Sequence, residues 1–170
     1  VLFSEAVTVT GTPQITLETG TADAVVDYSS GSGTPTIIFN YTVASGHTSS
    51  DLDYVSTSAL ALNGGTIKDA AGNTSIITLV TPGNTTSLGG HKGFIIDTAP
   101  ATVTSVASSA TDGTSYKVGD TVTLTVNFSE TVTGTGTPQL TLETGDADGV
   151  ASYVSGPGTN ALTFNYTVVE

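Results

Sequence analysis

Cysteine, methionine and tryptophan are absent from the 170-residue chain, and basic residues are scarce. Without cysteine, disulfide bonds and thiolate metal sites are excluded. Only three lysines (Lys68, Lys92 and Lys117) stand against fifteen aspartates and glutamates, which gives a formal net charge of −12. So few cations cannot neutralise a row of phosphates, and this balance argues against nucleic acid and anionic membranes as partners. The many carboxylates are instead available to bind cations.

Long apolar runs are missing as well. No run reaches the ~20 residues that a transmembrane helix needs, so we expect no membrane insertion. No signal peptide is visible either. Threonine, valine, serine and glycine are abundant, and this composition favours strands over helices. We therefore expect a soluble, all-β protein.

A long internal repeat organises the sequence. Phe3–Val43 recurs as Phe128–Val168 at a constant offset of 125 residues, and 28 of the 41 aligned residues are identical without a gap. This period is longer than the ~20–50 residues of a solenoid unit and suits one autonomous domain. We expect the chain to be a segment of a longer polypeptide, with neighbouring repeats as its partners.

Alternating apolar residues predict antiparallel strands. In Thr121–Glu130, four apolar side chains (Val122, Leu124, Val126 and Phe128) share one face, and threonines and Asn127 occupy the other. The same reasoning predicts strands at residues 1–5, around Ile15 and Leu17, at 25–28 and 37–43, around Leu60 and Leu62, and at 76–80 and 93–97. Within residues 37–43 the inward side chains are expected to be Ile37, Phe39, Tyr41 and Val43.

The predicted domain boundary is Asp97–Pro100, because Thr98–Ala99–Pro100 is short and rigid and strand signals resume at Thr102. Residues 1–99 then form a first repeat that lacks its N-terminal strands. Residues 100–170 form a second repeat that lacks its C-terminal strands. Strands spaced by about 8–14 residues, with turn residues between them, predict a two-sheet antiparallel β-sandwich of about seven to nine strands per repeat.

Four motifs carry a family resemblance: SYKVGDTVTLTVNFSE, GTPQLTLETG, LNGGTIKDAAGN and IIDTAPATVTSV. In this order they resemble the bacterial immunoglobulin-like repeats of very large secreted surface adhesins. The resemblance covers essentially the whole chain. It implies immunoglobulin-like β-sandwiches in tandem, which form a stalk on the bacterial surface and are commonly stiffened by Ca²⁺ at or near the linkers.

Four carboxylates are candidate Ca²⁺ ligands near the predicted boundary. Strand direction places Glu130 at the linker end of the second domain, and Asp51 and Asp53 at the pole of the first where Asp97 also lies. Ca²⁺ takes about six to eight oxygen ligands from carboxylates and carbonyls. The arrangement looks like the cadherin junction, although this linker lacks the longer acidic string of cadherins. In the alternative interpretation, Asp51 and Asp53 are solvated loop residues that cap turns, and Asp97 only accepts hydrogen bonds from linker amides.

A second candidate cluster consists of Glu5, Asp69 and Asn73. If the turn Lys68–Asn73 lies at the same pole as Glu5, the three side chains can meet around a cation. The favoured alternative is that Asp69 and Asn73 satisfy the amides of their own turn. Asp146 and Asp148 are best interpreted as residues of a polar hairpin turn, because the first copy of the repeat keeps only one of these carboxylates.

Catalysis finds little support in the sequence. His47 and His91 lie in glycine- and serine-rich loops and are expected to be exposed to solvent. No nucleophile elbow and no phosphate-binding loop occur. Glu18 and Glu143 are outward residues on equivalent strands of different domains, so they cannot flank one sugar as a glycosidase pair. We expect no enzymatic activity.

The sequence therefore predicts a calcium-rigidified spacer at the cell surface. One alternative is a Ca²⁺-dependent binding module for carbohydrates or surfaces, for which outward threonines such as Thr121, Thr123 and Thr125 offer an array of hydroxyl groups. A second alternative is a subunit of an extracellular filament, because sheet edges left without partners can exchange strands with other copies of the chain.

Overall fold

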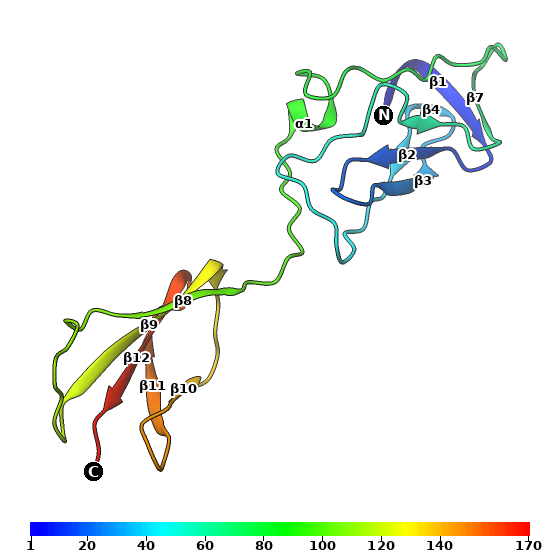
Figure 1. Ribbon diagram of the computed structural model, residues 1–170. Helices are drawn as coiled ribbons and strands as arrows, with labels where there is room; N and C mark the ends of the chain where they lie inside the picture. The colour runs from blue at the N-terminus through cyan, green and yellow to red at the C-terminus, as the bar shows by residue number, and fades with distance from the viewer. The chain divides into compact units, whose positions relative to one another are not determined.

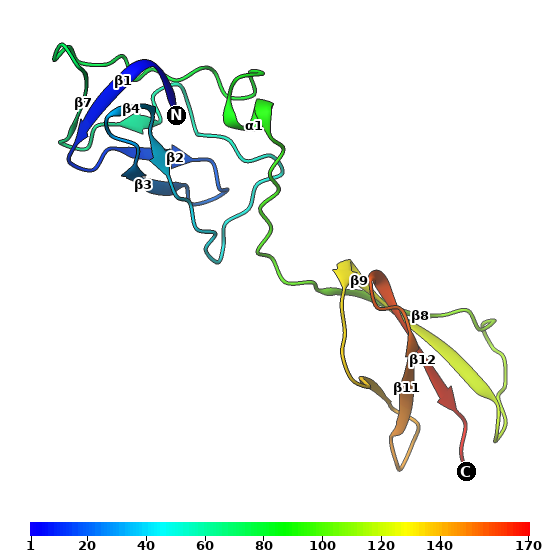
Figure 2. The ribbon, with the colours of Figure 1, turned by 180° about the vertical axis from the view of Figure 1, so that it is seen from behind.

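A computed structural model describes all 170 residues, and the chain divides into two compact units, Val1–Ala99 and Pro100–Glu170. Both units consist of antiparallel strands, and the only helix is a single turn (Figures 1 and 2). The prediction of an all-β, antiparallel fold is thus confirmed. No helix is long and apolar enough to cross a membrane.

The first unit, which we call unit 1, contains two sheets. A three-stranded sheet has the order β4-β1-β7, and a four-stranded sheet has the order β5-β3-β2-β6. The elements are β1 (Leu2–Thr10), β2 (Gln14–Leu17), β3 (Ala24–Ser30), β4 (Thr34–Thr36), β5 (Ile38–Phe39), β6 (Leu60–Ala61), β7 (Thr66–Asp69) and α1 (Leu88–His91).

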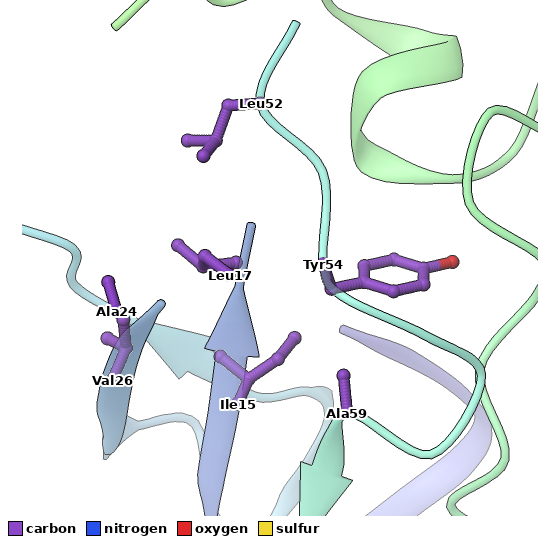
Figure 3. Packing of buried hydrophobic residues seen from close by; sticks show 7 residues of the cluster. All are labelled: Ile15, Leu17, Ala24, Val26, Leu52, Tyr54 and Ala59. Atoms are coloured by element: carbon purple, nitrogen blue, oxygen red, sulfur yellow. The ribbon is translucent and has the colours of Figure 1, made fainter. Parts of the chain in front are cut away.

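The core of unit 1 lies between these sheets. Ile15 and Leu17 of β2 are buried, as their alternation predicts, and they pack with β3 and with the loop that carries Leu52 and Tyr54 (Figure 3). A second group joins the two sheets, because Val7 and Ile67 of the three-stranded sheet share a cluster with side chains of β3 and β5. Apolar burial therefore holds the two layers together.

The second unit, unit 2, is a single five-stranded sheet of order β10-β11-β12-β9-β8. Its strands are β8 (Val103–Ser108), β9 (Thr121–Val132), β10 (Gln139–Leu142), β11 (Gly149–Ser155) and β12 (Thr159–Thr167). One apolar cluster, centred on Val126, Ala151, Leu162 and Phe164, forms its core. The two-sheet arrangement expected for every repeat is thus present in unit 1 and not in unit 2.

The repeated sequence produces the same hairpin in both units. Gly31 has a φ of 107°, Gly156 has a φ of 121°, and a Cβ at either position would lie 2.1 Å from the carbonyl oxygen five residues later. The hydroxyl of Thr34 donates to the carbonyl of Gly31, and Thr159 donates to Gly156 in the same way. Only glycine tolerates this close approach together with a positive φ, so the glycine defines the turn.

Three predicted strands differ from the structure. Residues 37–43 do not form one strand: only Ile38–Phe39 is β-structure, and Val43 is 49% exposed. Residues 76–80 form no strand, and Ile76 is 86% exposed. Residues 93–97 contribute only the isolated bridge between Ser49 and Ile96. In each case the apolar pattern is present but too few backbone partners lie alongside to extend a ladder.

Candidate functional site

Asp53 is a buried carboxylate that holds a loop in place. Its side chain is 8% exposed and accepts three hydrogen bonds: from the amide of Tyr54 (2.9 Å), the amide of Gly83 (3.0 Å) and the hydroxyl of Ser87 (2.6 Å). Ser87 also caps α1 by accepting a hydrogen bond from the amide of Gly90 at 3.1 Å. Asp53 therefore connects the segment that carries the core residues Leu52 and Tyr54 to the loop that leads into α1.

These hydrogen bonds determine the ionisation of Asp53. Burial by itself raises the pKa of a carboxyl group, but the donors of Ser87, Gly83 and Tyr54, together with the amide of Gly89, outweigh it and lower the pKa of Asp53 below 3.8. The carboxylate is thus ionised at neutral pH, and most of its acceptor capacity is taken up by the protein.

Asp51 is the more available carboxylate of the pair. It is exposed, and both aspartates lie against α1: a Cβ placed on Gly89 would be 3.1 Å from Oδ2 of Asp53 and 3.4 Å from Oδ1 of Asp51. Both carboxylates of the Asp-x-Asp motif therefore face the same glycine. This juxtaposition puts two negative charges at one place on unit 1.

Asp97 is also exposed, and it accepts a hydrogen bond from the amide of Ala99 at 3.0 Å. The bridge between Ser49 and Ile96 sets the antiparallel register here. The amide of Leu52 donates to the carbonyl of Phe94 at 2.8 Å, which places Asp51 beside residues 93–94. Asp97 follows Phe94 by three residues, which span about 10 Å in an extended chain. One ion binds both aspartates only if their side chains turn toward each other, because two oxygens on one Ca²⁺ are at most ~5 Å apart.

Glu130, the fourth predicted ligand, is half-buried on β9 of unit 2. Its convergence with the aspartates of unit 1 stays a prediction, because the structure defines each unit by itself. No group of three or more histidine, aspartate or glutamate side chains in the structure is arranged to hold a metal ion. Within unit 1, a cation would have to take Asp51, joined by Asp97 where the two side chains turn toward each other, together with backbone carbonyls and water.

The cluster of Glu5, Asp69 and Asn73 has a different character. The carboxylate of Asp69 accepts hydrogen bonds from the backbone amide and the side-chain amide of Asn73, both at 2.8 Å. These two bonds lower the pKa of Asp69. Glu5 is exposed on β1, two residues before Val7, which pairs with Asp69. The geometry favours the interpretation that Asp69 and Asn73 close their own turn.

Other acidic residues also serve turns. Glu18 accepts a hydrogen bond from the amide of Gly20, and Glu143 accepts one from the amide of Gly145. Both are thus local acceptors in equivalent turns of separate units. Asp146 and Asp148 are exposed in the hairpin turn between β10 and β11.

His47 is not simply a solvent-exposed loop residue, which corrects the expectation for this histidine. Its ring stacks on Tyr41 with centroids 5.7 Å apart, and the tyrosine hydroxyl lies 2.8 Å from Nδ1. The hydroxyl of Thr98 donates to the carbonyl of His47 at 2.9 Å. These contacts fasten the loop that follows residue 43 to the last residues of unit 1. No local signal in the sequence marks them, because Thr98 is 51 residues away. His91 is exposed, as expected.

Comparisons with known proteins leave the family open: no family model, no curated protein and no solved structure matches the chain.

Proposed function

We propose that the chain is a structural spacer, a segment of the stalk of a large extracellular bacterial adhesin at the cell surface, built from immunoglobulin-like β-sandwich domains in tandem. The observation that supports this proposal most is that the two copies of the repeat form equivalent structures. Tyr28 and Phe39 pack edge to face at 6.3 Å, and their counterparts Tyr153 and Phe164 do so at 5.9 Å. A near-copy of the same module at a fixed interval is what an extended rod requires.

The surface chemistry supports the same function. Recognition of a ligand usually needs one distinctive site, whereas the repeated stretch uses its polar side chains for its own turns, as Glu18 and Glu143 do. The partners of such a module are the neighbouring repeats of the same polypeptide. We propose no catalytic role.

Calcium is part of the proposal. A chain of net charge −12 repels its own neighbouring domains, and a bound divalent cation near the linker removes part of that repulsion. Asp51 and Asp97 would supply carboxylate oxygens, with Asp53 behind Asp51, and Glu130 would contribute from the next domain. A bound Ca²⁺ ion would supply positive charge and several coordination positions for oxygen ligands at the linker.

The proposal is tested by calorimetric titration of the chain with Ca²⁺. We expect binding that Asp51→Asn or Asp97→Asn weakens by about tenfold, because each substitution removes a charged ligand. Asp146→Asn is the matched control: it removes the same charge from an exposed turn of unit 2 and leaves binding unchanged. In small-angle scattering, chelator should increase interdomain flexibility. Identical scattering with and without Ca²⁺ contradicts the rigidified spacer.

A further inference from the structure

Five of the seven asparagines in the chain begin an Asn-x-Ser/Thr triplet whose middle residue is not proline. This triplet is the acceptor sequence for N-linked glycosylation and marks surface loops of secreted proteins. The five asparagines are Asn40, Asn73, Asn84, Asn127 and Asn165. The triplet alone does not distinguish among them, because a chain rich in serine and threonine contains it often. Their environments in the structure do.

The two triplet asparagines of unit 2 lie inside paired strands. Asn127 is half-buried on β9, which has β8 and β12 on its two sides, and Asn165 is half-buried on β12, between β9 and β11. Nδ2 of Asn127 donates to the hydroxyl of Ser105 at 2.9 Å, and Oδ1 of Asn165 accepts from the hydroxyl of Thr123 at 3.0 Å. An enzyme reaches either side chain in its active site only after local opening of the sheet.

Asn40 and Asn73 of unit 1 are exposed, but side chains outside their triplets hold them. Nδ2 of Asn73 donates to one oxygen of Asp69, and the backbone amide of Asn73 donates to the other, both at 2.8 Å. Nδ2 of Asn40 donates to the hydroxyl of Ser29 at 2.9 Å. In both asparagines the nitrogen that would carry a sugar is already engaged.

Asn84 differs from the other four. It is exposed in the turn that leads into α1 (Figure 1). Its amide donates to the carbonyl of Thr81 at 3.1 Å, and its carbonyl accepts from the amide of Ser87 at 2.8 Å. Its Oδ1 accepts from both the amide and the hydroxyl of Thr86, each at 3.1 Å. The carboxamide is thus held through its oxygen by the last residue of its own triplet, which leaves Nδ2 for a reagent from solution.

The turn around Asn84 is fixed and has space beside it. Asp53 accepts hydrogen bonds from the amide of Gly83 and the hydroxyl of Ser87, the residues on either side of the triplet. Beyond its chain neighbours, no heavy atom lies within 4 Å of the Cβ position of Gly83. A sugar attached to Asn84 therefore extends into solvent without displacing a packed side chain.

We propose that Asn84 is an acceptor for N-linked glycosylation by an asparagine glycosyltransferase that uses a glycosyl diphosphate as donor. The bond between Nδ2 and the anomeric carbon forms, and the bond between that carbon and the diphosphate oxygen breaks. The diphosphate leaves with the bonding electrons, and Nδ2 gives one proton to a base of the transferase. A nucleotide sugar and a lipid-linked glycan both supply this chemistry. The modification depends neither on Ca²⁺ nor on the spacer function.

Transfer to the folded chain tests the selection of Asn84. One arm uses a soluble asparagine glycosyltransferase with UDP-glucose, and the other uses a membrane oligosaccharyltransferase with a polyprenyl-diphosphate-linked glycan. Peptide mapping by mass spectrometry follows each site, and five synthetic peptides with one triplet each give the preference of the enzyme for sequence alone. Relative to these peptides, we expect the folded chain to favour Asn84 over the other four sites by at least about tenfold.

The two arms identify the donor, because transfer to Asn84 in one arm alone assigns the diphosphate to a nucleotide or to a lipid. Absence of transfer to Asn84 in both arms overturns the proposal. Relative rates in the folded chain that equal those of the peptides overturn it as well, because the structure then selects no site.

Two matched variants test the triplet in the folded chain. Thr86→Ala removes its third residue, whereas Thr85→Ala changes only the middle residue and keeps an Asn-x-Thr triplet. Both threonines are exposed, so both variants should keep the wild-type circular dichroism. We expect Thr86→Ala to abolish transfer to Asn84, Thr86→Ser to restore it, and Thr85→Ala to stay within about twofold of the wild-type rate. Equal transfer in Thr86→Ala and Thr85→Ala overturns the assignment.

Mass spectrometry of the chain recovered from the cells that make it tests the modification itself. We expect the peptide that contains Asn84 to carry the additional mass of one or more sugar residues, and the peptides that contain Asn127 and Asn165 to be unmodified. Native protein without sugar on Asn84 overturns the proposal.

Discussion

Asp51 and Asp53 differ in environment although they belong to one Asp-x-Asp motif. Asp53 is buried and fully engaged with Ser87, Gly83 and Tyr54, whereas Asp51 is exposed. The sequence shows both carboxylates and their spacing, which is enough to name them as candidate ligands. It does not show that Gly83 and Ser87 approach Asp53, because they follow it by 30 and 34 residues. The different environments of Asp51 and Asp53 therefore arise from tertiary contacts.

Replacement of Asp53 by alanine should destabilise unit 1. The substitution leaves the hydroxyl of Ser87 and the amide of Gly83 without their charged acceptor, and hydrogen bonds to charged groups contribute about 1.5–3 kcal/mol each to stability. We expect a loss of about 2–3 kcal/mol in urea unfolding followed by circular dichroism. Asp51→Ala is the control and should stay within about 0.5 kcal/mol, as exposed substitutions usually do. Equal losses for the two variants would contradict the structural role of Asp53.

The same carboxylate should make stability depend on acid. The pKa of Asp53 is lower in the folded protein than its ordinary value of 3.8, so its contribution is fully present above pH 3.8 and is lost as the pH falls through the folded-state pKa. The pKa of Asp69 is lowered as well, so this residue acts in the same direction. We expect the melting temperature to fall steeply below pH 3.8, and less steeply in Asp53→Asn. If the melting temperatures of the wild-type chain and of Asp53→Asn fall equally steeply below pH 3.8, the ionisation of Asp53 does not cause the loss of stability in acid.

At the scale of elements, the two copies of the repeat show what the sequence predicts and what it does not. Alternation predicts β2 and β9 with their inward faces, and the structure confirms the burial of Ile15, Leu17 and Val126. The stretch at residues 37–43 departs from its copy: Thr159–Thr167 is one continuous strand in unit 2, and its counterpart in unit 1 is divided into β4 and β5.

The cause of this difference lies in the neighbouring strand. In unit 2, β12 pairs with β9 from Thr159 to Thr167, whereas in unit 1 residues 40–43 have no strand paired beside them. Strand formation is thus a property of a pair of segments, and a pattern in one segment predicts it only where the partner is present. The expected strands at 76–80 and 93–97 are wrong for the same reason.

Glycine substitutions in the shared hairpin offer a matched test of the repeat. Gly31→Ala and Gly156→Ala should each cost about 2 kcal/mol or more in thermal unfolding, because the new Cβ meets a carbonyl oxygen at 2.1 Å and the φ is positive. Gly33 and Gly158 also have positive φ but open space around the Cβ position, so their alanine variants should cost only about 1 kcal/mol. A similar cost at all four glycines would show that the backbone conformation alone is decisive.

At the scale of the whole molecule, charge is the dominant property. Fifteen acidic residues and three basic ones leave few opportunities for ion pairs. Glu18, Asp53 and Asp69 accept hydrogen bonds from amides and a hydroxyl group instead, whereas Asp51 is exposed. Two consequences of added cations can therefore be separated. Any salt screens the general repulsion, whereas a specific ion acts through its own coordination geometry.

Calcium should stabilise the chain beyond the effect of ionic strength. We expect the melting temperature to rise in millimolar CaCl₂ by about 5–10 °C over NaCl at the same ionic strength. An ion at about 100 times its dissociation constant adds ~2.7 kcal/mol, and each kcal/mol raises the melting temperature of a chain of this size by about 2–4 °C. MgCl₂ is the control for divalent charge: Mg²⁺ loses its water reluctantly and demands near-octahedral geometry, so it should add little beyond screening. Differential scanning calorimetry in the three salts measures the difference. If Na⁺, Mg²⁺ and Ca²⁺ raise the melting temperature equally at matched ionic strength, the acidic residues are only screened, and Asp51, Asp97 and Glu130 hold no ion.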